Sequence, residues 1–325
     1  MTSATPALPL LEVSGLSKHF NVGGQRLQAV DKVSFKVWPG ETLGLVGESG
    51  CGKSTLARCI VKLLESDGGT LRFEGADLTH LSTRAMRPVR PKLQMVFQDP
   101  YTSLNPRRRV GDLIAEPLLV HRAGDASARR ARVQELAALV GLLPDQLQRY
   151  PHEFSGGQRQ RIGIARALAL SPKLVVADEP VSALDVSIQA QIINLMADLQ
   201  ERLGLTYIFI AHDLSVIRQV STRTAVMYLG SVVEMAPTDA LYATPAHPYT
   251  AALMNSVPQP RTQRAAPAIR SVLMGDPPSP LNPPTGCRFN PRCAAATALC
   301  RTERPALRDL GAGRHVACHF PLIPA

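Results

Sequence analysis

The sequence predicts an α/β fold with a helical insertion and a small C-terminal extension that contains several cysteines. Three observations support this prediction. Short apolar, strand-like runs alternate with helix-forming runs along most of the 325 residues. Between residues 110 and 170 the pattern is mostly helical. Four of the six cysteines lie beyond residue 286, in a proline-rich tail.

The N-terminal part is expected to form strands that lead into a glycine-rich turn and a helix. Runs rich in β-branched and apolar residues predict the strands Leu11–Val13, Leu27–Val37 and Thr42–Val46. A glycine-rich turn follows at residues 47–52. From about Lys53 to Leu64 the apolar residues fall on one face, which predicts a helix. Another strand ends at Gln98.

The following part is helical and then returns to alternation. Helix-forming sequence occupies Val110–Val120, Ala126–Gly141 and Gly157–Leu170. A strand, a helix and a strand then follow at Leu174–Ala177, Ser187–Leu203 and Thr206–Ala211. We therefore expect an α/β core with a helical subdomain at about residues 100–170.

A domain boundary is expected near residue 260. Beyond it the amino-acid composition changes: five prolines lie between Asp276 and Pro284, and a cysteine-containing tail follows them. We divide the chain into a main domain, residues 1–260, and an extension, residues 261–325.

The composition indicates a globular protein that does not cross a membrane by itself. Hydrophobic residues make up 45% of the chain, and no run approaches the roughly 18 apolar residues of a membrane span. The start, Met1–Leu11, has no basic residue ahead of its apolar stretch, so no secretory signal is expected. The net charge of +10 comes mainly from scattered arginines without an aromatic stacking platform. This pattern favours a solvated basic surface over a nucleic-acid-binding one.

The strongest motif is a glycine-rich loop between a strand and a helix. Residues 47–54 read Gly-Glu-Ser-Gly-Cys-Gly-Lys-Ser, which fits a phosphate-binding loop. Its glycines let backbone N–H groups turn toward phosphates, and the helix N-terminus adds partial positive charge. Lys53 is expected to contact the β and γ phosphates of ATP, and Ser54 to bind Mg²⁺. The predicted core is thus a P-loop ATPase, with ATP bound by Gly47, Glu48, Ser49, Gly50, Cys51, Gly52, Lys53, Ser54 and Thr55.

Two carboxylates follow the predicted strand Leu174–Ala177. Asp178 is placed to reach the Mg²⁺ shell, and Glu179 to orient or deprotonate the attacking water. Many strands end in acidic residues, so this pattern gains its meaning from the phosphate loop.

A serine and two glycines precede the last helix of the helical region. Ser155 is suited to cap that helix, and Gly156 and Gly157 permit the close approach of an anion. A simple helix cap would explain Ser155 but neither the paired glycines nor Gln158.

Taken in order, these motifs resemble those of ABC ATPases over most of the chain. The signature sequence of that family resembles Ser155, Gly156, Gly157 and Gln158, and its D-loop resembles Ser182, Ala183, Leu184 and Asp185. Gln98 resembles the Q-loop glutamine and His212 the switch histidine. Phe20 lies where the family places an aromatic residue against adenine. The resemblance implies catalytic roles for Glu179, His212 and Gln98, and Mg²⁺ binding by Ser54, Gln98 and Asp178.

The resemblance also implies an assembly. Two such domains meet head to tail and enclose two ATP molecules, so the signature of one chain serves the ATP held by the other. Hydrolysis lets the pair separate, and the Q-loop region passes that motion to membrane helices. The implied partners are a second, homologous ATPase subunit, two transmembrane permeases and an extracytoplasmic substrate-binding protein. The implied position is peripheral, on the cytoplasmic face of the inner membrane.

A second resemblance narrows the substrate class. The segment His247–Leu253, followed by Ser256-Val257-Pro258, is similar to the C-terminal extension of dipeptide and oligopeptide importer ATPases. Ser103–Pro106 and the start of the cysteine tail, Gly286–Phe289, fit that family too. Importers of nickel and of some sugars share parts of this pattern and remain an alternative. The particular peptide is not determined by this chain's sequence.

The four tail cysteines form a candidate metal site. Cys287, Cys293, Cys300 and Cys318 are separated by five, six and 17 residues. Four thiolates suit tetrahedral zinc or an iron–sulfur cluster, and a bound metal would stabilise a tail that is poor in large apolar residues. His315 or His319 could replace a thiolate in a zinc site, and four reduced, unliganded cysteines are the remaining alternative. Similarity to the tails of peptide-importer ATPases implies a [4Fe–4S] cluster.

Three other functions fit this sequence less well. ABC ATPases of DNA repair carry long insertions in the ATPase domain, whereas the segment from Gln98 to Ser155 is short. Translation factors of the ABC type carry two cassettes in one chain, and one is present here. A non-hydrolysing regulatory subunit would not need both Glu179 and His212.

Overall fold

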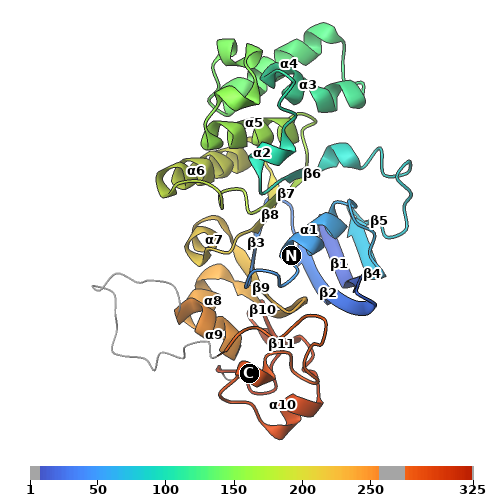
Figure 1. The fold of residues 1–325 in the computed structure, drawn as a ribbon, viewed down its shortest axis with the longest axis vertical. Coiled ribbons are helices and arrows are strands. Elements are labelled where there is room, and N and C mark those ends of the chain that lie inside the picture. The colour runs from blue at the N-terminus through green and yellow to red at the C-terminus, as the bar shows by residue number, and fades with distance from the viewer. Residues whose placement is uncertain (1–7, 256–274, 324–325) are drawn as a thin grey trace, which may run out of the picture.

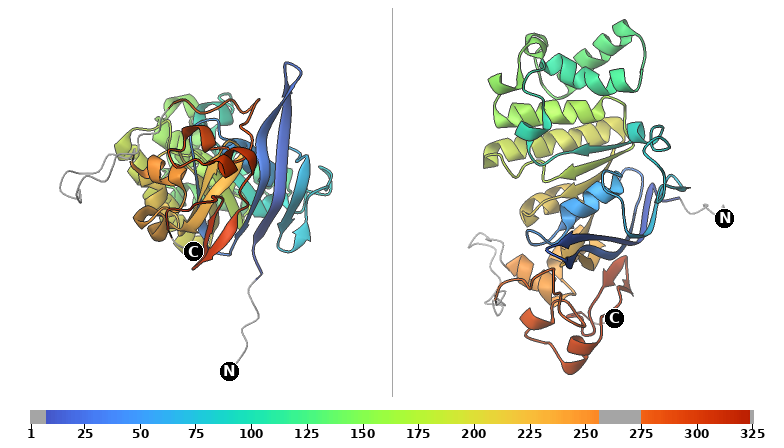
Figure 2. Two further views of the ribbon diagram at one scale, coloured as in Figure 1. Left: turned by 90° about the horizontal axis from the view of Figure 1, so that it is seen from below. Right: turned by 45° about the vertical axis from the view of Figure 1, so that its right-hand side comes forward.

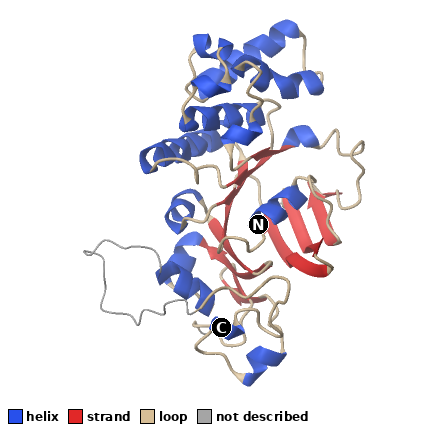
Figure 3. Ribbon diagram, viewed as in Figure 1, coloured by secondary structure: helices blue, strands red, loops and turns tan. Residues whose placement is uncertain are grey.

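The computed structural model describes residues 8–255 and 275–323, which form two β-sheets with helices around them (Figure 1). Coloured by secondary structure, the helices gather mainly at one end of the molecule, and the strands lie in its middle (Figure 3). The boundary predicted near residue 260 and the Ser256-Val257-Pro258 segment lie outside the described residues.

The larger sheet positions the ends of the strands that carry the predicted site. Its order is β11 (Arg308–Gly311), β12 (Arg314–Val316), β10 (Ser231–Pro237), β9 (Arg223–Tyr228), β3 (Thr42–Val46), β8 (Thr206–Ile210), β7 (Leu174–Asp178) and β6 (Leu93–Val96). From β9 to β6 neighbouring strands are parallel, whereas β10, β12 and β11 are added antiparallel. Every residue of β3, β7 and β8 is buried, because a central parallel strand is covered on both faces.

The smaller sheet is antiparallel and has the order β2 (Gln25–Val37), β1 (Leu11–Val22), β4 (Gly68–Phe73) and β5 (Ala76–Asp77). Strand β1 runs well beyond the predicted Leu11–Val13. The turn at Gly23 and Gly24, both with positive φ, returns the chain directly into β2. Pairing with β2 therefore extends β1 through residues whose side chains show little apolar alternation.

The helices are α1 (Lys53–Ile60), α2 (Pro100–Ser103), α3 (Val110–Val120), α4 (Ala126–Leu139), α5 (Gly156–Leu168), α6 (Val186–Leu203), α7 (Leu214–Val220), α8 (Thr238–Ala243), α9 (Pro248–Asn255) and α10 (Ala298–Thr302). Short 3-10 turns are η1 (Arg90–Lys92), η2 (Pro144–Gln148), η3 (Pro151–Glu153) and η5 (Asn290–Arg292). Helix α1 ends before the predicted Leu64, because Lys62 adopts a left-handed conformation with φ of 55°. Helices α2 to α5 form one end of the molecule (Figure 1).

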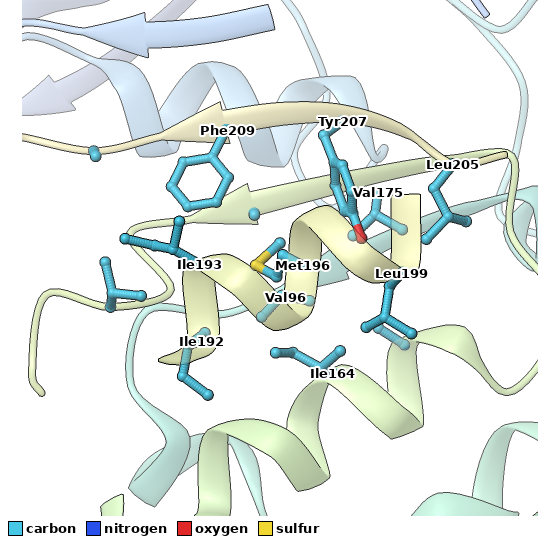
Figure 4. Close-up of a cluster of buried hydrophobic side chains, with 14 of the residues drawn as sticks. Val96, Ile164, Val175, Ile192, Ile193, Met196, Leu199, Leu205, Tyr207 and Phe209 are labelled. Carbon is cyan, nitrogen blue, oxygen red and sulfur yellow. The ribbon is translucent and has the colours of Figure 1, made fainter. Parts of the chain in front are cut away.

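A layer of apolar side chains fixes α6 between the larger sheet and α5 (Figure 4). Met196 and Leu199 of α6 are buried with Tyr207 and Phe209 of β8, and Ile164 contributes from α5. Full burial of a large apolar side chain contributes about 1.5–3 kcal/mol. This layer holds the carboxyl ends of β7 and β8, where the catalytic side chains are expected, at a fixed distance from α5.

The C-terminal extension continues the larger sheet. Strand β12 pairs with β10, so that Glu234 lies opposite Val316 and Met235 opposite His315. The extension lies against β10 at the end of the molecule away from α3 and α4 (Figure 2). The proposed division of the chain at residue 260 stays a prediction, but the two parts share one sheet.

A buried ion cluster also ties the extension to the N-terminal sheet. Asp31 of β2 accepts hydrogen bonds from Arg288 and from Arg304, the latter at 2.5 Å. Arg304 also donates to the hydroxyl of Ser231 on β10, at 2.7 Å. Burial opposes ionisation of Asp31, but the hydrogen bond and charges of the two arginines outweigh it and lower its pKa. The carboxylate therefore holds two arginines of the extension in place.

Removing the charge of Asp31 is expected to destabilise the protein. Asp31→Asn leaves the buried guanidinium of Arg288 without its compensating charge, which costs about 3 kcal/mol in comparable buried pairs. Chemical unfolding measures this loss, and the control Glu12→Gln, which removes a surface ion pair with Lys36, should cost less than about 1 kcal/mol. Because the folded-state pKa of Asp31 is lowered, its contribution is present above the unfolded pKa of about 3.9 and is lost as the pH falls through the folded value. A loss no greater than that of the control would contradict the assignment.

Candidate functional site

The loop of residues 47–52 connects β3 to α1 in a shape that only glycines adopt at two points. Gly47 and Gly52 have φ of 152° and 104°. A Cβ at Gly47 would lie 2.2 Å from the carbonyl oxygen of Met227, and one at Gly52 would lie 2.0 Å from that of Ala29. The loop therefore packs against the backbone of β9 and β2, and a side chain at either glycine would push these strands apart.

The N-terminus of α1 is suited to bind phosphate. Gly52 occupies the N-cap position and supplies no side-chain cap, so the first N–H groups of α1 are not capped by it. Lys53 is buried, and its ammonium donates to the carbonyl oxygens of Gly47 and Glu48 at 2.8 and 3.0 Å. The backbone of residues 47–52, the N-terminus of α1 and the ammonium of Lys53 together fit the polyphosphate of a nucleotide.

A hydroxyl and a carboxylate meet beside this loop. The Oγ of Ser54 donates to Oδ1 of Asp178 at 2.8 Å, across the gap between α1 and the end of β7. Burial raises the pKa of Asp178, whereas the hydrogen bond from Ser54 opposes that rise. Two oxygen ligands at one part-buried point are the donor type that Mg²⁺ prefers. A cation would also offset the burial of the carboxylate.

Two of the predicted catalytic residues lie close to the carboxylate of Glu179. The Nε2 of Gln98 donates to Oε2 of Glu179 at 2.9 Å, and Nδ1 of His212 lies 3.7 Å from the same oxygen. Glu179 has a φ of 47°, which is unusual for a residue with a side chain, and its N–H donates to the carbonyl of Ile210. This turn at the end of β7 directs the carboxylate toward Gln98 and His212. The structure thus brings together residues from three separate parts of the sequence.

The Ser155–Gln158 segment caps α5 and packs against the following loop. The Oγ of Ser155 accepts from the Gln158 N–H, and the Gln158 side chain accepts from the Ser155 N–H. A Cβ at Gly156 would lie 3.2 Å from Leu184, and one at Gly157 would lie 2.4 Å from Ile188. Within the described residues, these hydrogen bonds stay inside the cap and do not reach the phosphate loop. The glycines therefore allow α5 to pack closely against residues 182–188.

The predicted D-loop follows Glu179 directly. Both the N–H and the hydroxyl of Ser182 donate to the carbonyl of Glu179, at 3.2 and 3.1 Å. The N–H of Leu184 donates to Val181, and Asp185 occupies the N-cap of α6. The backbone of this loop is therefore tied to the turn that carries Glu179.

Phe20 lies apart from these groups on the β1–β2 hairpin, opposite Leu27. The ammonium of Lys18 lies 5.6 Å from the centre of its ring. The predicted stacking of Phe20 on adenine stays a prediction.

Sequence reasoning missed two residues that contact the phosphate loop. The backbone N–H of Glu48 donates to the hydroxyl of Tyr249 at 3.0 Å, and the side chain of Glu48 binds Arg292. Both partners belong to the C-terminal part, about 200 residues away in sequence or more. The His-Pro-Tyr segment carries a family resemblance, but no local pattern indicates which loop it contacts.

The four tail cysteines line one small cavity together with His319. His315 instead lies on β12 and lines a different cavity. Burial raises the pKa of the Cys287 and Cys293 thiols, and that of Cys318 to about 11, which disfavours free thiolates. Within the described ranges, no group of three or more His, Cys, Asp or Glu side chains is arranged to hold a metal ion. The donor set thus suits a metal, whereas a ready-made metal site is not supported.

Among the described residues, no helix combines the length and apolar character needed to cross a membrane.

The site combines three features: a phosphate loop at a helix N-terminus, a hydroxyl–carboxylate pair beside it, and a Gln–Glu–His group at the ends of neighbouring strands. Together they define a P-loop ATPase of the ATP-binding cassette class. The ABC transporter family profile matches residues 30–182, and the profile of the oligopeptide/dipeptide transporter C-terminal region matches residues 233–300. The chain belongs to the peptide-type ATP-binding proteins of the ABC transporter family.

Similar proteins support this family assignment along nearly the whole chain. YkfD of Bacillus subtilis, named as an oligopeptide transport ATP-binding protein, is 52% identical over 315 residues, 96% of each chain. The oligopeptide transport ATP-binding protein AppF of the same organism is 51% identical over 319 residues, 96% of this chain and 97% of AppF.

Solved structures support the fold of the main domain. The dimeric post-hydrolysis structure of the ATP-binding cassette MJ0796, bound to ADP and Pi, has a TM-score of 0.65 at 28% identity. It covers 70% of this chain and 98% of its own. CbiO1 from Clostridium perfringens, part of the ABC transporter complex CbiONQ, also has a TM-score of 0.65 at 26% identity, over 72% of this chain and 91% of CbiO1.

Proposed function

We propose that this chain is the ATP-hydrolysing subunit of an ABC importer for dipeptides or oligopeptides. The observation that carries the proposal is the convergence of Gln98 and His212 on the carboxylate of Glu179, beside the Ser54–Asp178 pair. The same chain carries the C-terminal region of oligopeptide and dipeptide transporters, and the similar proteins are named for peptide transport.

The site residues have separate tasks in this proposal. The backbone of residues 47–52 and the ammonium of Lys53 bind the phosphates, and Thr55 adds to this cradle at the start of α1. Ser54, Asp178 and Gln98 would hold Mg²⁺, which neutralises charge on the phosphates when bound. Glu179 takes a proton from the attacking water, while Gln98 and His212 fix the orientation of its carboxylate.

The signature segment is proposed to serve ATP held by a second ATPase subunit. Ser155 and Gly156 are accessible on the surface, and their hydrogen bonds are directed along their own helix rather than toward residues 47–55. A helix N-terminus with glycines is a suitable anion site for a neighbouring chain's nucleotide. The partners would be a similar but distinct ATPase, two permeases and an extracytoplasmic binding protein, with this chain peripheral on the cytoplasmic membrane face.

Assembly is expected to control activity. The isolated chain should hydrolyse ATP slowly, because each site lacks the signature segment of a partner. Co-expression with its permeases and second ATPase should raise turnover and allow co-purification. High, permease-independent hydrolysis by a stable monomer would contradict this assembly.

The substrate class is tested by uptake. Cells that lack this chain are expected to lose accumulation of a labelled peptide and to regain it with the wild-type gene. Nickel uptake, measured in the same cells, should stay unchanged. Loss of nickel uptake with intact peptide uptake would favour the alternative importer.

The four tail cysteines are proposed to bind a [4Fe–4S] cluster, with Zn²⁺ as the alternative. Their placement around one cavity supports a shared ligand. Protein purified without oxygen should be brown and contain about four irons per chain, and Cys300→Ser should lower that content. Cys59→Ala, which removes a cysteine buried in α1, is the control and should retain the iron. A colourless preparation with one zinc would overturn the iron assignment, and one without metal would overturn the site.

A further inference from the structure

One residue of the C-terminal extension binds the phosphate loop directly. Arg292, at the end of η5, donates from Nη1 to Oε2 of Glu48 at 2.8 Å and from Nη2 to Oε1 at 3.0 Å. This is the two-pronged pairing that makes an arginine–carboxylate contact both strong and directional. The Arg292 side chain is only 5% exposed, so water screens the pair weakly.

The position of Arg292 is itself held by packed aromatic rings. Its guanidinium lies 5.9 Å from the ring centre of Tyr228, and the Tyr228 hydroxyl accepts from it at 3.4 Å. The rings of Tyr228, Tyr249 and Phe289 contact one another, with centres 4.6 to 5.4 Å apart. Phe289 begins the turn that ends in Arg292. The docking of the extension against these rings therefore determines the position of the Arg292 guanidinium.

Glu48 transmits this contact to the nucleotide site. Its N–H donates to Tyr249, its carboxylate is bound by Arg292, and its carbonyl oxygen accepts from the ammonium of Lys53. Glu48 is thus held to the C-terminal part by its N–H and by its carboxylate, while its carbonyl oxygen contacts Lys53. In addition, an unpaired Glu48 would place a negative charge on the loop that receives a polyphosphate anion.

We propose that Arg292 is a positioning residue for the phosphate loop: it neutralises and orients Glu48, so that tight ATP binding requires the C-terminal extension to be docked. This inference rests on the proposed ATPase function, and it assigns to the extension a direct part in nucleotide binding. The extension then acts on ATP affinity, whereas the group around Glu179 acts on turnover.

The test compares binding of the non-hydrolysable analogue AMP-PNP, with Mg²⁺, to the full chain. Arg292→Ala is expected to weaken binding by about tenfold, because two charge-assisted hydrogen bonds are lost and Glu48 stays charged. Arg292→Lys keeps the charge but loses the two-pronged hydrogen bonding. Its affinity for AMP-PNP should lie between those of the wild type and Arg292→Ala. Arg301→Ala, an exposed arginine of the same extension, is the matched control and should bind like the wild type.

A rescue distinguishes the loss of charge neutralisation at Glu48 from a general disturbance of the tail. Adding Glu48→Gln to Arg292→Ala removes the unpaired charge and is expected to recover most of the lost affinity, although the arginine is still absent. In the assembled transporter, Arg292→Ala should raise KM for ATP while kcat at saturating ATP changes less than about twofold. If Arg292→Ala does not fold, Arg292→Gln, which keeps a polar side chain without the charge, serves as the variant.

Two results would overturn the inference. One is binding by the arginine variants that matches Arg301→Ala, and the other is a double variant that binds no better than Arg292→Ala. Failure of the wild-type chain to bind the nucleotide at all would instead count against the proposed ATPase function.

Discussion

Replacing Glu179 with glutamine is expected to lower ATP hydrolysis by a factor on the order of 10² or more while leaving ATP binding intact. The amide has nearly the same shape as the carboxylate, so the contact with Gln98 at 2.9 Å can be kept. It cannot accept the proton of the attacking water, and that step therefore loses its base. The rate is measured as phosphate release by the assembled transporter at saturating ATP, and binding is measured separately with AMP-PNP.

A matched control separates the site from the general effect of losing a carboxylate. Glu201→Gln changes an exposed residue near the end of α6 and should leave turnover and binding unchanged. Normal turnover by Glu179→Gln would refute the role assigned to that carboxylate. Loss of binding together with turnover would show that Glu179 supports the site rather than the chemistry.

Lys53→Ala is expected to weaken ATP binding by about 100-fold. The ammonium is buried beside the loop carbonyls and is placed to donate to the phosphates instead. Loss of two hydrogen bonds to a charged group, at about 1.5 kcal/mol each, amounts to about 3 kcal/mol. AMP-PNP titration measures the change in affinity.

The control for this prediction is Lys36→Ala, which removes an exposed lysine of β2 that pairs with Glu12. Its affinity for the nucleotide should equal that of the wild type. An affinity of Lys53→Ala for AMP-PNP within about threefold of the control would contradict the prediction. The Lys53 ammonium would then contribute less than about 1 kcal/mol to the binding free energy, and another group would have to hold the phosphates.

Local sequence was sufficient for the elements whose own pattern decides their structure. Strand β3 and helix α3 have the bounds that their apolar patterns predict. The glycine-rich turn predicted at residues 47–52 is present, and Gly47, Gly50 and Gly52 in it have positive φ. The two cysteines outside the tail, Cys51 and Cys59, are both buried.

Elements that depend on pairing were missed. Strands β4, β9 and β10 were not predicted, and β1 was predicted too short, because their extent is decided by hydrogen bonds to strands elsewhere in the chain. The tail strands β11 and β12 are short and polar, and they become strands by joining the edge that β10 offers. Backbone groups at such an edge must find partners, whatever the side chains prefer.

By itself the sequence predicted the chemistry: which residues are expected to hold phosphate, bind a divalent cation and take a proton, and in which order they occur. That information is local, because glycine, lysine and carboxylate chemistry depends on residue type and on the strand or helix beside it. The tertiary structure alone decided which of these groups meet. It placed Gln98 and His212 on one oxygen of Glu179, and it seated Arg292 on the phosphate loop. Such contacts join segments tens to hundreds of residues apart, and they form only when burial of the apolar layers between them fixes the distances.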